Sequence, residues 1–293
     1  MKLCRTTEIN INKEAESWSL TIRPQRGWFD LRLGELWRAR ELIVLFVWRD
    51  FVSVYKQTIL GPLWYLIQPL LTTITFTVIF GRIASLSTDH LPDFLFYMAG
   101  TVVWGYFAQC LTKTSETFIT NAPLFGKVYF PRLTVPISIL ISSLIAFAIQ
   151  FVLFLGFVGY YMAIGAPVHP NVVLFLLPIL LIIMAGLGLA SGIIVSALTV
   201  RYRDLRYLVT FGIQLFMYAT PVVYPLSSVS GNFRLLILAN PLTSIVETFR
   251  FGFLGTGTVS VWYLLYSFVF MLITLVIGVL LFNHVEATFM DTV

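Results

Sequence analysis

The sequence predicts an all-α, polytopic membrane protein that crosses the bilayer six times. Of its 293 residues, 58% are hydrophobic and only 11% are charged, and the mean hydropathy is +0.87. A soluble domain carries far more charge. Apolar stretches of about 18 or more residues without charge are typical of bilayer-spanning helices. Six such stretches occur, at residues 62–80, 94–111, 133–163, 171–200, 207–225 and 259–283.

The distribution of Lys and Arg predicts the orientation. Most of the 19 lie before the first stretch, between the second and third, or between the fourth and fifth. Only Arg82, Arg234 and Arg250 lie on the other side. Because positively charged loops stay in the cytoplasm, both termini are predicted to be cytoplasmic. This asymmetry accounts for the basic pI of about 9.2, and no basic stretch is dense enough to indicate nucleic-acid binding.

Three parts are predicted around the membrane domain. Residues 1–32 form a cytoplasmic N-terminal segment, residues 59–285 form the six-span domain, and residues 286–293 form a cytoplasmic tail. Between the first two, residues 33–58 are predicted to be an amphipathic helix at the membrane interface and its exit. In the fourth span, Pro178 and the glycines 186, 188 and 192 are positions at which the helix could bend.

The interface helix is predicted from its apolar side chains, which share one face. Two tryptophans in it suit the headgroup boundary of a membrane, and a short packed cytoplasmic helix is the alternative interpretation. Gly61-Pro62 then marks a bend, since proline is tolerated in the first turn of a helix. The candidate interface residues are Trp37, Trp48, Arg49 and Asp50.

Three connecting segments carry further signals. The loop 112–136 holds a short apolar piece between Pro123 and Pro131, either a docking helix for a soluble partner or a plain connector. In the turn 200–208, Asp204 can cap the next helix or pair with a neighbouring arginine. Residues 226–258 are predicted to form two short helices that re-enter from the external side, the second capped by Asn240. On this second helix one face is shared by Leu242, Ile245, Val246, Phe249 and Phe253, with Thr243, Glu247 and Arg250 elsewhere.

The spans contain little catalytic or ion-coupling chemistry. None of the six stretches contains Asp, Glu, Lys, Arg or His, and Lys113 and Glu116 lie just beyond the inner end of the second. Ion-driven transporters usually need ionisable or unwound sites at mid-membrane, and enzymes need clustered catalytic groups. The three histidines are scattered, so no metal site is indicated. The piece "FGKV" lacks the glycine and hydroxyl residues of a phosphate loop. The chain therefore has the pattern of a conduit that is powered from elsewhere.

Two spans carry mixed polar and aromatic faces that could line this conduit. Hydroxyl and amide groups beside aromatic rings suit sugars, and helix–helix packing is the alternative interpretation. On the first and fifth spans the candidate lining residues are Tyr65, Gln68, Thr72 and Phe76, and Tyr207, Phe211, Gln214 and Tyr218.

Five motifs occur in an order that resembles one family. They are "GWFDLRLGELWRARELIVLFVWRDFVSVYKQTILGPLWYLIQPLL" (27–71), "NAPLFGKVYFPRLTVP" (121–136), "RYRDLRY" (201–207), "PVVYP" (221–225) and "NPLTSIVETFR" (240–250). Over about residues 20–285 the chain resembles the permease subunit of ABC-2 type exporters. The first motif is the most specific, and it points to the O-antigen and lipopolysaccharide polysaccharide exporters, with capsule and teichoic-acid exporters as cousins.

The resemblance implies a homodimer that binds two separate ATPase subunits, either with or without a carbohydrate-binding domain. ATP and Mg would bind to those subunits, and no cofactor is expected on this chain. The substrate is expected to be an undecaprenyl-diphosphate-linked polysaccharide exported across a bacterial inner membrane. Alternatives are a capsule or teichoic-acid polymer, or drugs and lipids. A membrane enzyme or an ion-coupled flippase would need the clustered or mid-membrane charges that are absent.

The resemblance also implies roles for particular segments. Residues 121–131 would be a coupling helix in a groove of the ATPase, and residues 226–256 would be the external gate helices. The candidate ATPase-coupling residues are Asn121, Pro123, Leu124, Phe125, Lys127, Phe130, Pro131, Arg132, Arg203 and Asp204. Lys56, Arg203 and Arg206 are candidate contacts for the lipid diphosphate. The candidate gate residues are Tyr224, Asn240, Pro241, Glu247 and Arg250.

Overall fold

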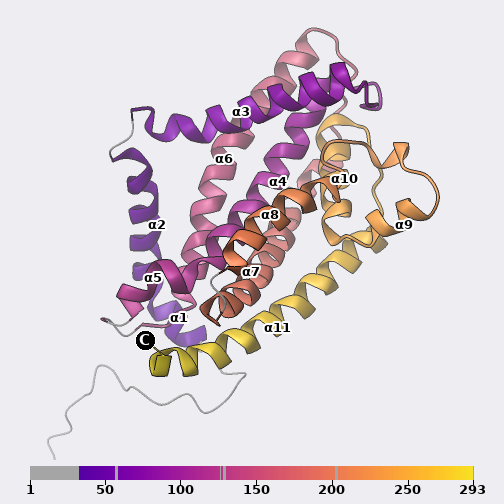
Figure 1. Cartoon of the computed structure of the whole chain (residues 1–293). Coiled ribbons are helices and arrows are strands. Elements are labelled where there is room, and N and C mark those ends of the chain that lie inside the picture. The colour runs from indigo at the N-terminus through magenta and orange to yellow at the C-terminus, as the bar shows by residue number, and fades with distance from the viewer. Residues whose placement is uncertain (1–32, 57–58, 126, 128–129, 202–203, 293) are drawn as a thin grey trace, which may run out of the picture.

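Helices form all the regular structure in the part of the chain that the computed structural model describes, residues 33–56, 59–125, 127, 130–201 and 204–292 (Figure 1). This confirms the all-α prediction. The helices are α1 (Leu33–Arg38), α2 (Arg40–Tyr55), η1 (Gly61–Leu63), α3 (Trp64–Phe76), η2 (Thr77–Ile83), α4 (Asp93–Ser115), α5 (Thr117–Phe125), α6 (Thr134–Ala163), η3 (Val172–Leu176), α7 (Leu177–Arg201), α8 (Leu205–Tyr218), η4 (Leu226–Ser228), α9 (Asn232–Leu238), α10 (Pro241–Leu254) and α11 (Val261–Thr292).

Among the described residues, five helical segments are long and apolar enough to cross a membrane. They are Gly61–Ile83, Asp93–Ser115, Thr134–Ala163, Val172–Thr199 and Val261–Phe282. Each coincides with a predicted span, so the chain is a multi-pass membrane protein.

The remaining predicted span, 207–225, is not a continuous helix. Its helix α8 has 14 residues and ends at Tyr218, and the chain then runs through turns to residue 225. At 1.5 Å per residue α8 is about 21 Å long, which is less than the ~30 Å hydrocarbon core of a bilayer. The count of six spanning helices is therefore not confirmed.

The predicted interface helix is divided into α1 and α2 at Ala39. Phe46 of α2 is 5% exposed and packs onto the helical body. Trp37 and Trp48 are instead 70% and 63% exposed. Arg49 pairs with its neighbour Asp50 at 2.9 Å. One side of the segment thus packs on protein, as the packed interpretation expects. Both tryptophans face outward, and contact of that outer side with a membrane surface stays a prediction.

The bend predicted at Gly61-Pro62 is present. Gly61 is buried and has φ +50°, a backbone conformation in which a side chain would be strained, and Pro62 lies in the first turn of η1. Figure 1 shows α3 running across the direction of α2. The polypeptide therefore changes direction sharply where the first span begins.

Helix α4 lies at the centre of the largest core, and α7 packs against it and against α11. The glycines of α7 face these neighbours. A Cβ added at Gly192 would lie 2.6 Å from Cβ of Thr114, and one at Gly188 would lie 2.7 Å from Cβ of Cys110. Helix α7 continues through both positions. The glycines predicted as places to bend are thus sites of close helix packing, as is common between membrane helices.

Replacement of Gly192 by Ala is expected to destabilise the protein by about 1–3 kcal/mol, because the added methyl group would overlap Thr114. Thermal unfolding of the purified protein in detergent checks this. Gly156→Ala on α6 is the matched control, since a Cβ there meets nothing within 4 Å. Equal melting temperatures for the two variants would contradict this account of the α4–α7 contact.

Candidate functional site

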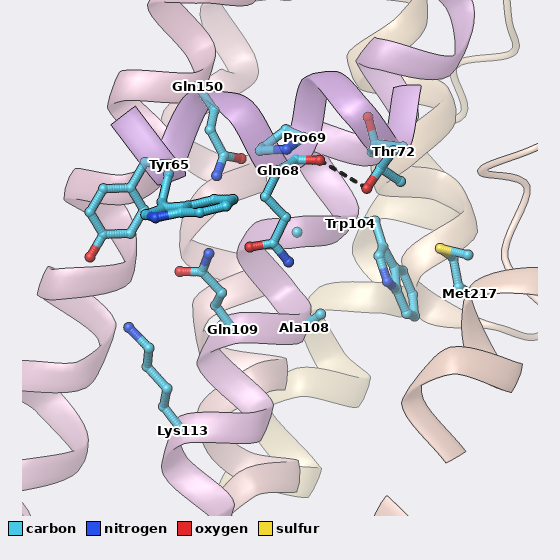
Figure 2. A pocket seen from close by; sticks show the side chains of 13 residues that line it. Tyr65, Gln68, Pro69, Thr72, Trp104, Ala108, Gln109, Lys113, Gln150 and Met217 are labelled. Carbon is cyan, nitrogen blue, oxygen red and sulfur yellow. Dashed lines mark hydrogen bonds between the residues drawn. The ribbon is translucent and has the colours of Figure 1, made fainter. Parts of the chain in front are cut away.

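A pocket of about 480 Å³ opens between the first three spanning helices (Figure 2). Helix α3 provides one wall, α4 the second, and Gln150 of α6 and Met217 of α8 complete it. Its volume lies within the usual range of ligand sites, about 300–1,000 Å³. The lining residues are Trp64, Tyr65, Gln68, Pro69, Thr72, Thr101, Trp104, Gly105, Ala108, Gln109, Lys113, Gln150 and Met217.

The local sequence of α3 explains one wall. Tyr65, Gln68 and Thr72 follow the helical spacing of three and four residues and therefore share a face. Pro69 lies inside α3 and has no N–H for the preceding turn. Separately, the Thr72 hydroxyl donates to the Gln68 carbonyl at 3.0 Å. This face turns toward α4 and α6, so it borders the pocket.

Three of the four predicted lining residues of α3 therefore lie together: Tyr65, Gln68 and Thr72. Phe76 is 9% exposed and packs edge-on against Phe80, with ring centroids 5.4 Å apart, so it faces the core rather than the pocket. Periodicity alone did not single out Gln109 and Gln150, because neither belongs to a repeated polar and aromatic face of its long apolar helix.

The predicted lining residues of α8 lie outside this pocket. Tyr207, Phe211 and Tyr218 are 77%, 59% and 48% exposed, and Gln214 is exposed as well. Helix α8 packs on α4 and α7 through its opposite side, where Phe216 contacts Trp104 with ring centroids 5.9 Å apart. Together, Tyr207, Phe211, Gln214 and Tyr218 form an uncovered polar and aromatic face, and their role in lining a channel remains a prediction.

The predicted coupling segment is partly helical. Helix α5 ends at Phe125, so it begins and ends earlier than the predicted range 121–131. Pro123 and Lys127 are exposed, Leu124, Phe130 and Pro131 are half-buried, and Asn121, Phe125 and Arg132 are buried. The Asn121 amide donates to the Thr117 carbonyl at 3.0 Å. Much of the segment's apolar surface therefore packs inward, and Ile119, Thr120, Pro123 and Lys127 are its exposed side.

An aromatic cluster connects α5 to α2 and to three longer helices. Phe46 of α2 meets Phe130 edge-on at 5.7 Å, and Phe125 lies 5.6 Å from Phe130. Phe118 of α5 stacks on Phe282 of α11 at 4.9 Å, and the same core includes residues of α6 and α7. We call Phe46, Phe118, Phe125, Phe130 and Phe282 the aromatic cluster. It joins the predicted coupling segment to the predicted interface helix by direct contact.

The positions considered for a lipid diphosphate differ in their surroundings. Lys56 is exposed at the end of α2. The Nε atom of Arg206 lies 2.8 Å from Oε1 of Glu116, so this ion pair neutralises part of the arginine's charge. Arg203 lies outside the described residues. Asp204 begins α8 without a side-chain hydrogen bond to the helix, so the predicted cap is absent.

The predicted gate segment contains two α-helices, α9 and α10, after the short 3-10 helix η4, and Asn240 caps α10 as expected by accepting from the Leu242 N–H at 3.0 Å. Pro241 occupies the first turn. The Asn240 amide also donates to the Thr220 hydroxyl at 2.8 Å. The Tyr224 hydroxyl donates to the Tyr218 carbonyl at 3.1 Å. The segment is thus fastened to the end of α8.

Arg250 and Glu247 are buried, although they lie outside the predicted apolar face of α10. Arg250 is 1% exposed and Glu247 is 3% exposed. The Nη1 atom of Arg250 lies 3.7 Å from Oε1 of Glu247. The Arg250 guanidinium donates to the carbonyls of Pro221, Val222 and Tyr224, and it lies 3.8 Å from the ring centroid of Phe96. We call this group the Arg250 cluster. It holds the "PVVYP" backbone in a non-helical path.

Burial shifts the pKa values of Arg250 and Glu247 in opposite directions. Burial lowers the pKa of Arg250 to about 10, with the carboxylate of Glu247 opposing this shift, so the guanidinium is protonated at neutral pH. Burial raises the pKa of Glu247, and the guanidinium opposes that shift. The Thr258 N–H donates to Oε2 of Glu247 at 3.2 Å, which compensates part of the carboxylate's lost hydration.

Comparisons with known proteins agree on one family. A sequence profile described as ABC-2 type transporter matches residues 41–254. Two proteins from Klebsiella pneumoniae named "O-antigen export system permease protein RfbA" are each 27% identical, over 86% of this chain and 94% of their own length. A protein of that name from Myxococcus xanthus is 30% identical, over 74% of this chain and 81% of its own length.

Proposed function

The chain belongs to the ABC-2 type transporter family, and from this premise we propose that it is the membrane subunit of an ATP-driven O-antigen exporter. It would move a lipid-linked polysaccharide across the bacterial inner membrane, with both termini in the cytoplasm. The observation that carries this proposal is the coverage of the relatives. Three proteins named O-antigen export permeases align with 74–86% of this chain and with most of their own length.

The active assembly is proposed to be a homodimer of this chain with two ATPase subunits, which would bind ATP and Mg and, in one form of the proposal, carry a carbohydrate-binding domain. The exposed face of α8, formed by Tyr207, Phe211, Gln214 and Tyr218, supports the dimer proposal, since such a face needs a partner or a passing substrate to cover it. With the face of α3, it would line the path of the polymer.

The ATPase would drive the permease through α5. Its exposed residues, among them Pro123 and Lys127, are available for docking, while Phe125 lies in the aromatic cluster. Phe46 places α2 in the same cluster, and α2 leads through the bend at Gly61 into α3. A displacement of α5 would therefore pass by side-chain contact to α2 and on to the first span.

The substrate would enter from the inner leaflet, with its diphosphate near Lys56, Arg203 and Arg206 and its glycan toward the polar faces of α3 and α8. The Arg250 cluster would hold the external end of the path, because it ties α10 to the chain that follows α8. Hydroxyl-rich chains suit uncharged amides and aromatic rings, which this chain places along α3.

The proposal is tested by co-expressing the chain with the ATPase encoded beside it and reconstituting the purified complex. ATP-dependent appearance of lipid-linked O-polysaccharide on the far side of the membrane is the expected result. Replacement of Tyr65, Gln214 and Tyr218 together by Ala is expected to lower this transport at least tenfold, while the complex stays assembled. Val152→Ala, at an exposed position of α6, is the control.

Two outcomes would count against these assignments. Full transport by the triple variant would show that those three residues serve in helix packing and do not line the path of the polymer. Polymer that stays in place while drugs or lipids stimulate ATP hydrolysis would overturn the O-antigen assignment.

A further inference from the structure

Three glutamine side chains from three different helices meet in the pocket. Gln68 comes from α3, Gln109 from α4 and Gln150 from α6. Figure 2 shows their carboxamide groups directed into the same space, with Trp104 beside it and Lys113 at one end. A carboxamide offers two donors and an acceptor, so three of them present a dense set of uncharged hydrogen-bonding groups.

These carboxamides are not used by the protein itself. The Oε1 atom of Gln109 is buried and has no hydrogen-bond partner among the described residues. Gln150 is only 5% exposed, and its side chain makes no hydrogen bond to any other residue that the structure describes. Its Oε1 lies 3.7 Å from the place that a Cβ would occupy at Gly105. An amide without a partner is unfavourable when buried, so a ligand with hydroxyl groups that enters the pocket would gain hydrogen bonds that the protein leaves unmade.

The charge of the lining restricts what that group can be. Of the 13 lining residues, Lys113 alone carries a full charge at neutral pH, and none is a carboxylate. Recognition of an acidic ligand usually relies on several cations or bidentate arginines. Trp64, Tyr65 and Trp104 add flat apolar surfaces beside the amides. Amides with aromatic rings match the hydroxyl groups and C–H faces of uncharged sugars.

We propose that Gln68, Gln109 and Gln150 form a sugar-binding subsite within one protomer, which selects uncharged sugar units over acidic ones as the polymer passes. This inference rests on the proposed function, because it takes the exported glycan to be the ligand. It adds specificity-determining residues on α4 and α6 to the predicted faces of α3 and α8.

The test uses the double variant Gln109→Met with Gln150→Met in the complex with its ATPase. The probes are an oligosaccharide released from the O-polysaccharide and the same oligosaccharide with its primary alcohols oxidised to carboxylates. Binding is followed by tryptophan fluorescence, since Trp64 and Trp104 line the pocket. The wild-type complex is expected to bind the uncharged probe at least tenfold more tightly, and the double variant to lose about tenfold in affinity for it.

Thermal stability distinguishes a binding role of the glutamines from a purely structural one. Because these amides have no protein partner, the double variant is expected to melt no lower than the wild type. Ser142→Ala on α6 removes a buried hydroxyl that has no partner among the described residues and lies outside the pocket. It is therefore the matched control and should leave binding unchanged. The single variant Gln150→Met provides the same comparison if the double variant does not fold.

Unchanged affinity in the glutamine variants would overturn the subsite, and so would equal or tighter binding of the oxidised probe. ATP-driven export by the wild-type complex is measured in parallel. If the wild-type complex exports polymer and the glutamine variants bind the probe with unchanged affinity, the subsite alone is refuted. Absence of export by the wild type would instead refute the proposed function.

Discussion

Replacement of Arg250 by Met is expected to lower the free energy of unfolding by about 3–5 kcal/mol, because it leaves the buried carboxylate of Glu247 without its cation. The carbonyls of Pro221, Val222 and Tyr224 would lose their donor in the same step. The melting temperature of the purified protein in detergent measures the loss. We also expect the variant to be cut faster by protease in the segment that follows α8.

A double variant distinguishes the ion pair from the rest of the cluster. Glu247→Gln added to Arg250→Met removes the uncompensated charge, so it should recover part of the lost stability. Arg234→Met is the control, since Arg234 is exposed on α9 and should change stability by less than about 0.5 kcal/mol. If Arg250→Met melted like Arg234→Met, the Arg250 cluster would not hold this part of the fold.

Replacement of Phe46 by Ala is expected to cost about 3–5 kcal/mol and to separate ATP hydrolysis from export. Phe46 is 5% exposed, and its ring meets Phe130 at 5.7 Å and the guanidinium of Arg49 at 4.8 Å. It is the residue that places α2 in the aromatic cluster. The reconstituted complex should therefore keep hydrolysing ATP while moving less polymer per ATP.

The control for this prediction lies on the same helix. Val44 is 67% exposed, so Val44→Ala should leave both the melting temperature and the ratio of polymer moved to ATP hydrolysed unchanged. Phe46→Leu keeps most of the buried volume and should recover most of the coupling. An unchanged ratio in a folded Phe46→Ala complex would show that motion of α5 does not reach the first span through α2.

The predicted fold was most accurate where long apolar runs decided the structure. Five spans, the bend at Gly61 and the cap at Asn240 all depend on local properties of the chain, namely length, backbone conformation and a side chain beside its own helix. The run 207–225 is also apolar, yet its helix stops at Tyr218, shortly before Pro221, which cannot continue the helical hydrogen bonds. Contacts from distant residues then fix the path beyond that point, because Arg250 and Asn240 bind backbone and side chains there.

The site was only partly predictable for the same reason. Helical spacing placed Tyr65, Gln68 and Thr72 on one face, and the structure keeps them together. Spacing cannot show which face of a long apolar helix turns toward a pocket, so Gln109 and Gln150 were not distinguished. It also placed Glu247 and Arg250 outside the shared apolar face of α10, yet both are buried. Their spacing of three residues allows a pair on one helix, but it does not show that the surrounding chain will bury that pair.

The short length of α8 would affect any lipid that it contacts. A helix of 14 residues cannot match the full hydrocarbon thickness of a membrane. Wherever α8 meets lipid, the acyl chains must compress or tilt, and headgroups and water are drawn inward. Such local thinning shortens the distance over which a lipid-attached sugar chain is removed from water. The membrane beside α8 would then be the place where sideways passage of such a molecule costs the least free energy.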